Sequence, residues 1–121
     1  MVFEKQTAYC MKRALLNTLG GLKGLWQHEK AFRMEIYCSM LLLPLIFLMH
    51  IPDFLRVLML LLLFLLFVVE TINSAIEVVV DRISLEIHEQ SRLAKDMGST
   101  AVGITILMNI VVWAYAIWIQ I

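Results

Sequence analysis

Three apolar stretches constrain the fold of this 121-residue chain. Residues 36–52 and 97–121 contain no Asp, Glu, Lys or Arg, and residues 57–69 are wholly apolar. A helix needs about 20 mostly apolar residues to cross a bilayer. Hydrophobic residues form 61% of the chain, against roughly 45–50% in soluble domains. The sequence therefore predicts an all-α membrane protein with three transmembrane helices, over about residues 34–50, 54–80 and 97–119.

An amphipathic segment precedes the first span. Apolar residues recur there at spacings of three and four, which is typical of one face of a helix: Ala8, Met11, Leu15, Leu19, Leu22 and Trp26. Lys12, Lys23 and Lys30 border this face, as expected for a helix that lies among lipid headgroups. We expect an interfacial helix over about residues 7–30, and a helix packed over the bundle fits the pattern equally well.

The distribution of basic residues indicates the topology. Six of the ten Lys and Arg residues precede residue 34, namely Lys5, Lys12, Arg13, Lys23, Lys30 and Arg33. Arg82, Arg92 and Lys95 lie in the polar segment 82–96. Because basic loops stay on the cytoplasmic side, we expect the amino terminus and an 82–96 loop in the cytoplasm, with the carboxyl terminus outside. Polar linkers are absent from the sequence, which predicts one membrane-embedded domain over residues 1–121. The first span should remain in the mature protein, because no small-residue cleavage site follows it.

Acidic and amide side chains follow the second apolar stretch at helical spacing. Glu70, Asn73, Glu77 and Asp81 are three, four and four residues apart, so on a helix they share an arc of about 80°. Carboxylates at membrane depth are costly, at about 2.5–3.5 kcal/mol each on insertion scales, and usually serve a function. Their hard oxygen atoms suit Mg²⁺. The pattern predicts a divalent-cation site, and the alternative is a polar clamp between helices.

Two further charged clusters are expected at the same membrane edge. Glu29, Arg33 and Glu35 stand at the entrance to the first span, and Lys95 with Asp96 stands before the third. Taken alone, the first cluster fits an ordinary membrane boundary and the second fits a topology signal. The sequence contains no P-loop and no protein-kinase motif, so nucleotide chemistry here requires a different kind of site.

The segment ETINSAIEVVVDRI, together with EIHEQSRLAKDMGSTAV, closely resembles the prokaryotic diacylglycerol kinase family. The resemblance extends over about residues 14–118. It implies a homotrimer in the bacterial cytoplasmic (inner) membrane, with active sites shared between subunits and no nucleic-acid partner. It also implies transfer of phosphate from ATP to sn-1,2-diacylglycerol, giving phosphatidic acid for phospholipid recycling, with Mg²⁺ as the cofactor.

The resemblance further implies a role for each matching residue. Glu70 would be the general base, and Glu29 and Glu77 would bind the Mg²⁺ carried by ATP. The residues matching nucleotide-binding positions are Glu29, Glu77, Glu86, Ile87, His88, Lys95 and Asp96. Those matching lipid-binding positions are Ala31, Phe32, Arg33, Glu35, Arg56, Glu70, Asn73, Ser99, Trp113 and Trp118.

The chain departs from the family in its amino-terminal segment. Cys10 and Asn17 stand where better-studied members have an Arg and a Tyr, so nucleotide contacts from that segment do not carry over. An undecaprenol kinase of the same family is the nearest alternative function. A small multidrug transporter, which has four spans, and a structural membrane subunit are the alternatives from other classes.

Overall fold

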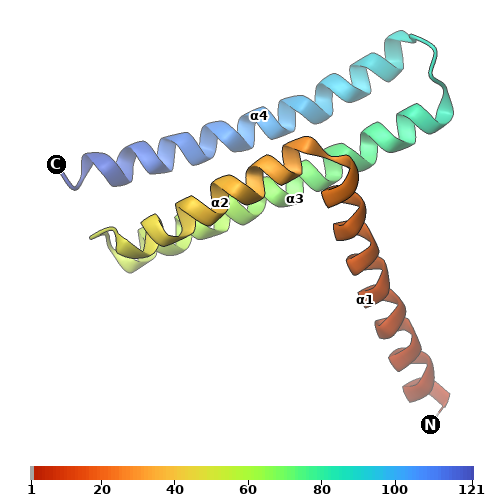
Figure 1. Ribbon diagram of the computed structural model, residues 1–121, viewed down its shortest axis with the longest axis horizontal. Coiled ribbons are helices and arrows are strands. Elements are labelled where there is room, and N and C mark those ends of the chain that lie inside the picture. Colours follow the sequence, from red (N-terminus) through yellow and green to blue (C-terminus); the bar gives the residue numbers. More distant parts are fainter. Residues whose placement is uncertain (1) are drawn as a thin grey trace.

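The computed structural model consists of four α-helices and describes the backbone of residues 2–121, with side chains from Glu4 onward. The helices are α1 (Val2–His28), α2 (Lys30–Leu48), α3 (Asp53–Ile83) and α4 (Glu89–Trp118). The chain runs through α2, α3 and α4 in three side-by-side passes, while α1 projects away from this bundle (Figure 1). The described residues contain no strand, which confirms the all-α prediction.

Three of these helices are long and apolar enough to cross a membrane: α2, α3 and α4. This confirms the prediction of three spans preceded by a separate helix. Pro44 lies inside α2, yet the helix continues past it to Leu48, a behaviour that membrane helices tolerate. Large apolar side chains on the outer surfaces of the three helices are exposed in the single chain, as expected for faces that contact lipid or another subunit.

The predicted loop over residues 82–96 is wrong in its extent. Helix α3 continues to Ile83 and α4 already begins at Glu89, so only residues 84–88 connect them. His88 is the N-cap of α4, and its Nδ1 accepts a hydrogen bond of 3.1 Å from the backbone N–H of Gln90. Charged residues end an apolar stretch without ending a helix, so both helices extend beyond the apolar segments from which the spans were predicted.

A sharp corner separates α1 from α2 at a single residue, Glu29. Its backbone is extended, with φ −110° and ψ 105°, which interrupts an otherwise helical run. The Nη1 atom of Arg33 donates a hydrogen bond of 2.6 Å to the carbonyl of Trp26 in the last turn of α1. Trp26 also makes an edge-to-face contact with Tyr37, with ring centroids 5.9 Å apart. These contacts tie the end of α1 to the beginning of α2 and hold Glu29 at the corner.

The apolar core lies toward the end of the bundle that contains the α2–α3 turn. It joins all three spans through Ile46, Ile51, Leu55, Met59, Val112 and Ala116. Arg56 fixes the turn, because its guanidinium donates hydrogen bonds to the carbonyls of Ile46 at 3.2 Å and Met49 at 2.8 Å. These carbonyls lie at the carboxyl end of α2. The last carbonyls of a helix have no N–H donor from a following turn, so Arg56 supplies donors that the helix itself lacks.

Helices α3 and α4 pack closely at two polar positions. Gly98 of α4 lies against the side chain of Asn73 on α3, where a Cβ would meet the amide oxygen. Nearer the middle of the spans, Nδ2 of Asn109 donates a hydrogen bond of 3.0 Å to the carbonyl of Leu62. Hydrogen bonds from amide side chains are a common means of helix association in membranes. The two contacts fix the register of α4 along α3.

Candidate active site

The predicted acidic stripe, Glu70 to Asp81, lies on α3. The half that follows the apolar stretch directly is buried. Glu70 is 5% exposed, Asn73 is 8% exposed and the neighbouring Ser74 is 4% exposed. Glu77 is partly buried, and Asp81, farther along, is exposed. The apolar stretch before Glu70 continues the helix without interruption, so helical geometry alone carries these side chains onto one face. The buried end of the stripe faces the interior of the protein rather than lipid.

Four carboxylates gather around this buried end. Glu29 and Glu77 act electrostatically on Glu70, and Glu70 in turn acts on Glu35. Glu29 comes from the α1–α2 corner, Glu35 from the first turns of α2, and Glu70 and Glu77 from α3. Like charges at close range repel one another, which disfavours an arrangement of this kind unless cations or protons compensate. The predicted meeting of the cluster at Glu29 and Glu35 with the α3 stripe is therefore present.

The described residues contain no group of three or more His, Cys, Asp or Glu side chains arranged to hold a metal ion. Glu29 and Glu77 are the two carboxylates that act electrostatically on Glu70. Mg²⁺ favours oxygen ligands and is commonly bound by one or two carboxylates together with substrate phosphates. The donor set therefore fits an ion that arrives with a polyphosphate.

Unpaired polar atoms are buried at the same site. Within the described part of the chain, Oε2 of Glu35, Oδ1 of Asn73 and Oγ of Ser74 are buried without a hydrogen-bond partner. Leaving such a group unpaired costs about 1–3 kcal/mol. Buried polar groups of native proteins nearly always have partners, and exceptions concentrate at functional sites. The three atoms therefore have hydrogen-bonding capacity that the rest of the described chain does not use.

Several residues predicted to bind lipid surround the α1–α2 corner. Phe32 is buried and packs edge-to-face on Phe67 of α3, with centroids 5.9 Å apart. Arg33 is partly buried and engages the carbonyl of Trp26. Ala31, next in sequence to Phe32, is exposed, and Ser99, which lies on α4 rather than at the corner, is also exposed. The corner thus brings Phe32 onto α3 about one helical turn before Glu70, while Arg33 holds the end of α1.

Other predicted lipid contacts lie far from Glu70. Arg56 is roughly 20 Å away along α3, at about 1.5 Å per residue, and its guanidinium bonds to the carboxyl end of α2. Trp113 and Trp118 lie toward the carboxyl end of α4, which reaches the same end of the bundle as the α2–α3 turn (Figure 1). Trp118 is exposed and packs against Tyr115. Within one chain, these three side chains do not meet the carboxylate cluster.

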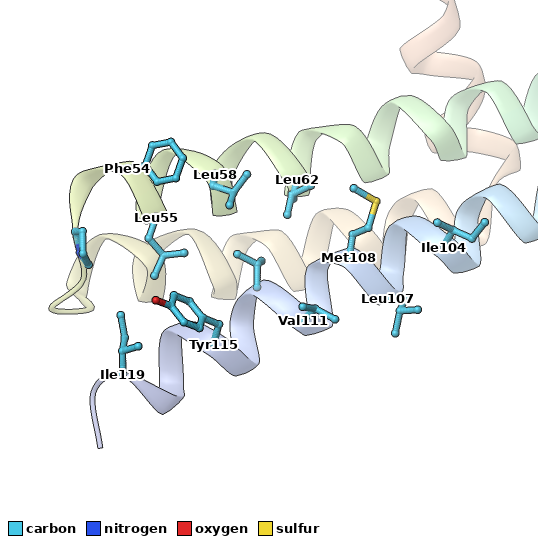
Figure 2. A pocket seen from close by; sticks show the side chains of 12 residues that line it. Phe54, Leu55, Leu58, Leu62, Ile104, Leu107, Met108, Val111, Tyr115 and Ile119 are labelled. Carbon is cyan, nitrogen blue, oxygen red and sulfur yellow. The ribbon is translucent and has the colours of Figure 1, made fainter.

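An apolar groove of about 720 Å³ runs between α3 and α4 at that far end. Figure 2 shows side chains of α3, including Phe54, Leu58 and Leu62, on one side and those of α4, including Val111 and Tyr115, on the other. Its lining is almost wholly hydrocarbon, so it offers no chemistry to a reacting group.

The predicted nucleotide contacts converge at the α3–α4 connection. A cavity of about 240 Å³, here called the loop pocket, is lined by Val80, Asp81, Ser84, Leu85, Glu86, Ile87, His88, Ser91, Arg92, Lys95 and Asp96. Five of the seven residues predicted to bind ATP belong to this lining, and Glu29 and Glu77 do not. Nζ of Lys95 forms a 2.6 Å ion pair with Asp81 across the pocket.

Three structural features were not predicted from the sequence. Asn109 joins α4 to α3, Ser39 of α2 is buried with an unpaired hydroxyl, and Arg92 lines the loop pocket. A polar residue inside an apolar span was the available signal for Asn109 and Ser39. Arg92 was read only as a marker of topology, because its helical register was unknown.

Known proteins resemble this chain over most of its length. The model of the family described as prokaryotic diacylglycerol kinase matches residues 17–117. The diacylglycerol kinase of Escherichia coli (strain K12) is 42% identical over 98 residues, which cover 81% of this chain and 80% of the relative. That of Pseudomonas aeruginosa is 40% identical over 115 residues, covering 93% and 92%.

A more distant relative, the diacylglycerol kinase of Helicobacter pylori (strain J99), is 37% identical over 107 residues, covering 88% of this chain and 79% of the relative. The matched region contains the carboxylate cluster, the α1–α2 corner and the loop pocket. The chain is therefore an enzyme, a membrane kinase, and it belongs to the prokaryotic diacylglycerol kinase family.

Proposed function

We propose that this protein transfers the γ-phosphate of ATP to the free hydroxyl of sn-1,2-diacylglycerol, producing phosphatidic acid and ADP in phospholipid recycling. One observation supports this most strongly. Glu70 is a buried carboxylate on an apolar helix long enough to span a membrane, and it interacts electrostatically with three other carboxylates. The relatives that match over most of the chain carry the name diacylglycerol kinase. A lipid alcohol can reach this depth while its acyl chains remain in the bilayer.

In the proposed mechanism, Glu70 is the general base. Its carboxylate accepts the proton of the lipid hydroxyl while the hydroxyl oxygen forms a bond to the γ-phosphorus. The bond between that phosphorus and the β,γ-bridging oxygen breaks, and ADP leaves with the electron pair. A positioned base contributes about 10²–10⁴-fold to such a step, and most of the remaining acceleration comes from alignment of the reactants and neutralisation of charge.

Glu29 and Glu77 would hold Mg²⁺ bound to ATP, since both carboxylates lie within electrostatic reach of Glu70. When bound, the ion neutralises phosphate charge as the transferred group moves. Glu86, Ile87, His88, Lys95 and Asp96 would hold the nucleotide in the loop pocket. Glu35, Asn73 and Arg33 would position the lipid headgroup, because they lie around Glu70 or at the adjacent corner.

We also propose the topology and assembly. The amino terminus and the α3–α4 connection would be cytoplasmic, because most basic residues lie there, and the carboxyl terminus would lie outside the inner membrane.

A homotrimer would cover the side of the acidic stripe where Glu29 and Glu77 remain partly exposed. The partner subunits would then complete the site and could supply contacts for Trp113 and Trp118.

A lipid-product assay tests the proposed function. The purified protein is incubated in bicelles with Mg²⁺, labelled ATP and either dioleoylglycerol or undecaprenol, and the lipids are resolved. We expect phosphatidic acid as the main product. Undecaprenyl phosphate as the main product would replace the proposed substrate with the nearest alternative, and absence of any phosphorylated lipid would contradict the proposal.

A further inference from the structure

Two cationic side chains line the loop pocket, and they differ in their partners. Lys95 forms its 2.6 Å ion pair with Asp81, which joins α4 to the end of α3 across the pocket. Arg92 also lines the pocket, but no carboxylate of residues 4–121 lies within ion-pair distance of its guanidinium. The guanidinium is therefore the cation of this pocket that is available to an anion without first breaking a contact.

The start of α4 presents several donors on the same side as Arg92. His88, Ser91, Arg92 and Lys95 all line the pocket, and their spacings of three and four place them on one helical face. Nδ1 of His88 accepts a hydrogen bond from the backbone of Gln90, so a neutral ring carries its proton on Nε2 and has a donor to spare. A guanidinium, a hydroxyl and an imidazole N–H together suit an anion with several oxygens.

The backbone fixes Arg92 in this place. Its N–H donates a 3.0 Å hydrogen bond to the carbonyl of His88, in the first turn of α4. Ser84 opposite is also fixed, because its hydroxyl accepts a 3.0 Å hydrogen bond from the N–H of Glu86. Local hydrogen bonds therefore hold the backbone on both walls of the pocket.

We propose that Arg92 binds the polyphosphate of the nucleotide in the loop pocket, as an addition to the contacts expected of Lys95. This inference rests on the proposed function, which supplies ATP as the ligand. A planar guanidinium can donate hydrogen bonds to two phosphate oxygens at once. Such a paired contact is strong and also fixes the orientation of the phosphate. Asp81 partly neutralises Lys95, whereas Arg92 offers the pocket a positive charge without a carboxylate partner among residues 4–121.

Kinetics of Arg92→Gln test this proposal. We expect the KM for MgATP to rise about five- to tenfold, the usual effect of losing one charge-assisted contact, with kcat and the KM for lipid nearly unchanged. Arg92→Lys keeps the charge and should restore part of the affinity. Arg82→Gln is the matched control, because Arg82 is an exposed arginine in the last turn of α3 that does not line the pocket.

An unchanged KM for MgATP in Arg92→Gln would overturn the proposal, and so would an equal effect in Arg82→Gln. A rise in the KM for lipid alone would assign Arg92 to lipid binding instead. Direct binding of inorganic triphosphate to wild type and to Arg92→Gln, measured by calorimetry, gives a readout without turnover. If wild type phosphorylates no lipid, the proposed function fails, yet weaker triphosphate binding by Arg92→Gln would still support the assigned role of Arg92.

Discussion

Gly98 of α4 lies so close to Asn73 of α3 that a methyl group at position 98 would collide with the amide oxygen of Asn73. Asn73 is one helical turn from Glu70, and both side chains are buried. The absence of a side chain at Gly98 therefore allows α4 to cover the site closely. A larger residue at position 98 would therefore require the side chain of Asn73 or one of the two helices to shift.

Gly98→Ala should separate α3 from α4 beside the site. Overpacking of this kind typically costs about 1–3 kcal/mol, and the displaced Asn73 should also lower kinase activity. Thermal unfolding in detergent and lipid-phosphorylation rates measure the two effects. Gly103→Ala is the control, because a Cβ there meets nothing within 4 Å, and it should be neutral or slightly stabilising. Equal behaviour of the two variants would contradict this interpretation of the packing.

Arg56→Ala should destabilise the protein without a direct effect on the chemical step. The guanidinium bonds to the carbonyls of Ile46 and Met49, and removing it leaves the end of α2 without these donors, at a cost of about 1.5–3 kcal/mol. Thermal unfolding should show the loss, while kcat at low temperature stays near the wild-type value.

Asp53→Ala provides the comparison for Arg56. It removes only the 2.8 Å ion pair with Arg56, in which the side chain of Asp53 is 97% exposed, and exposed pairs contribute little. A large fall in kcat for Arg56→Ala with unchanged stability would instead favour the direct role in lipid binding that the family resemblance implies.

Ser39→Ala should leave stability unchanged or raise it. The hydroxyl of Ser39 is buried without a hydrogen-bond partner, so its removal relieves an unpaired polar group. Thr105→Ala is the contrasting variant, because the hydroxyl of Thr105 donates a 2.9 Å hydrogen bond to the carbonyl of Ala101. Thermal unfolding of both variants checks this, and a marked loss for Ser39→Ala would show that its hydroxyl has a partner in the assembled protein.

The number and order of the helices were predictable from the sequence because apolar stretches of sufficient length have few alternatives in a bilayer. The alignment of Glu70, Asn73 and Glu77 on one face followed from helical spacing alone. The burial of Glu70 and Asn73 and the electrostatic effect of Glu29 on Glu70 depend on how the helices pack. The catalytic and binding roles of these residues remain predictions.

Details that depend on packing were not predictable. The 82–96 segment looked like a loop because it is polar, but helices continue through most of it. The partners of Arg56 are carbonyls of the preceding helix, and a sequence does not reveal which backbone groups a helix end leaves unpaired. Arg92 faces the loop pocket only because α4 begins at Glu89, which sets its register.

Glu70 is proposed to remove the proton of the lipid hydroxyl, and the most direct test is the rate of phosphatidic acid formation by Glu70→Gln at saturating MgATP and diacylglycerol. We predict that kcat falls by about 10²–10⁴-fold, with direct ATP binding and thermal stability retained. Glu4→Gln, an exposed position on α1, should match wild type. A Glu70→Gln variant that keeps wild-type kcat would contradict the assignment of Glu70 as the general base.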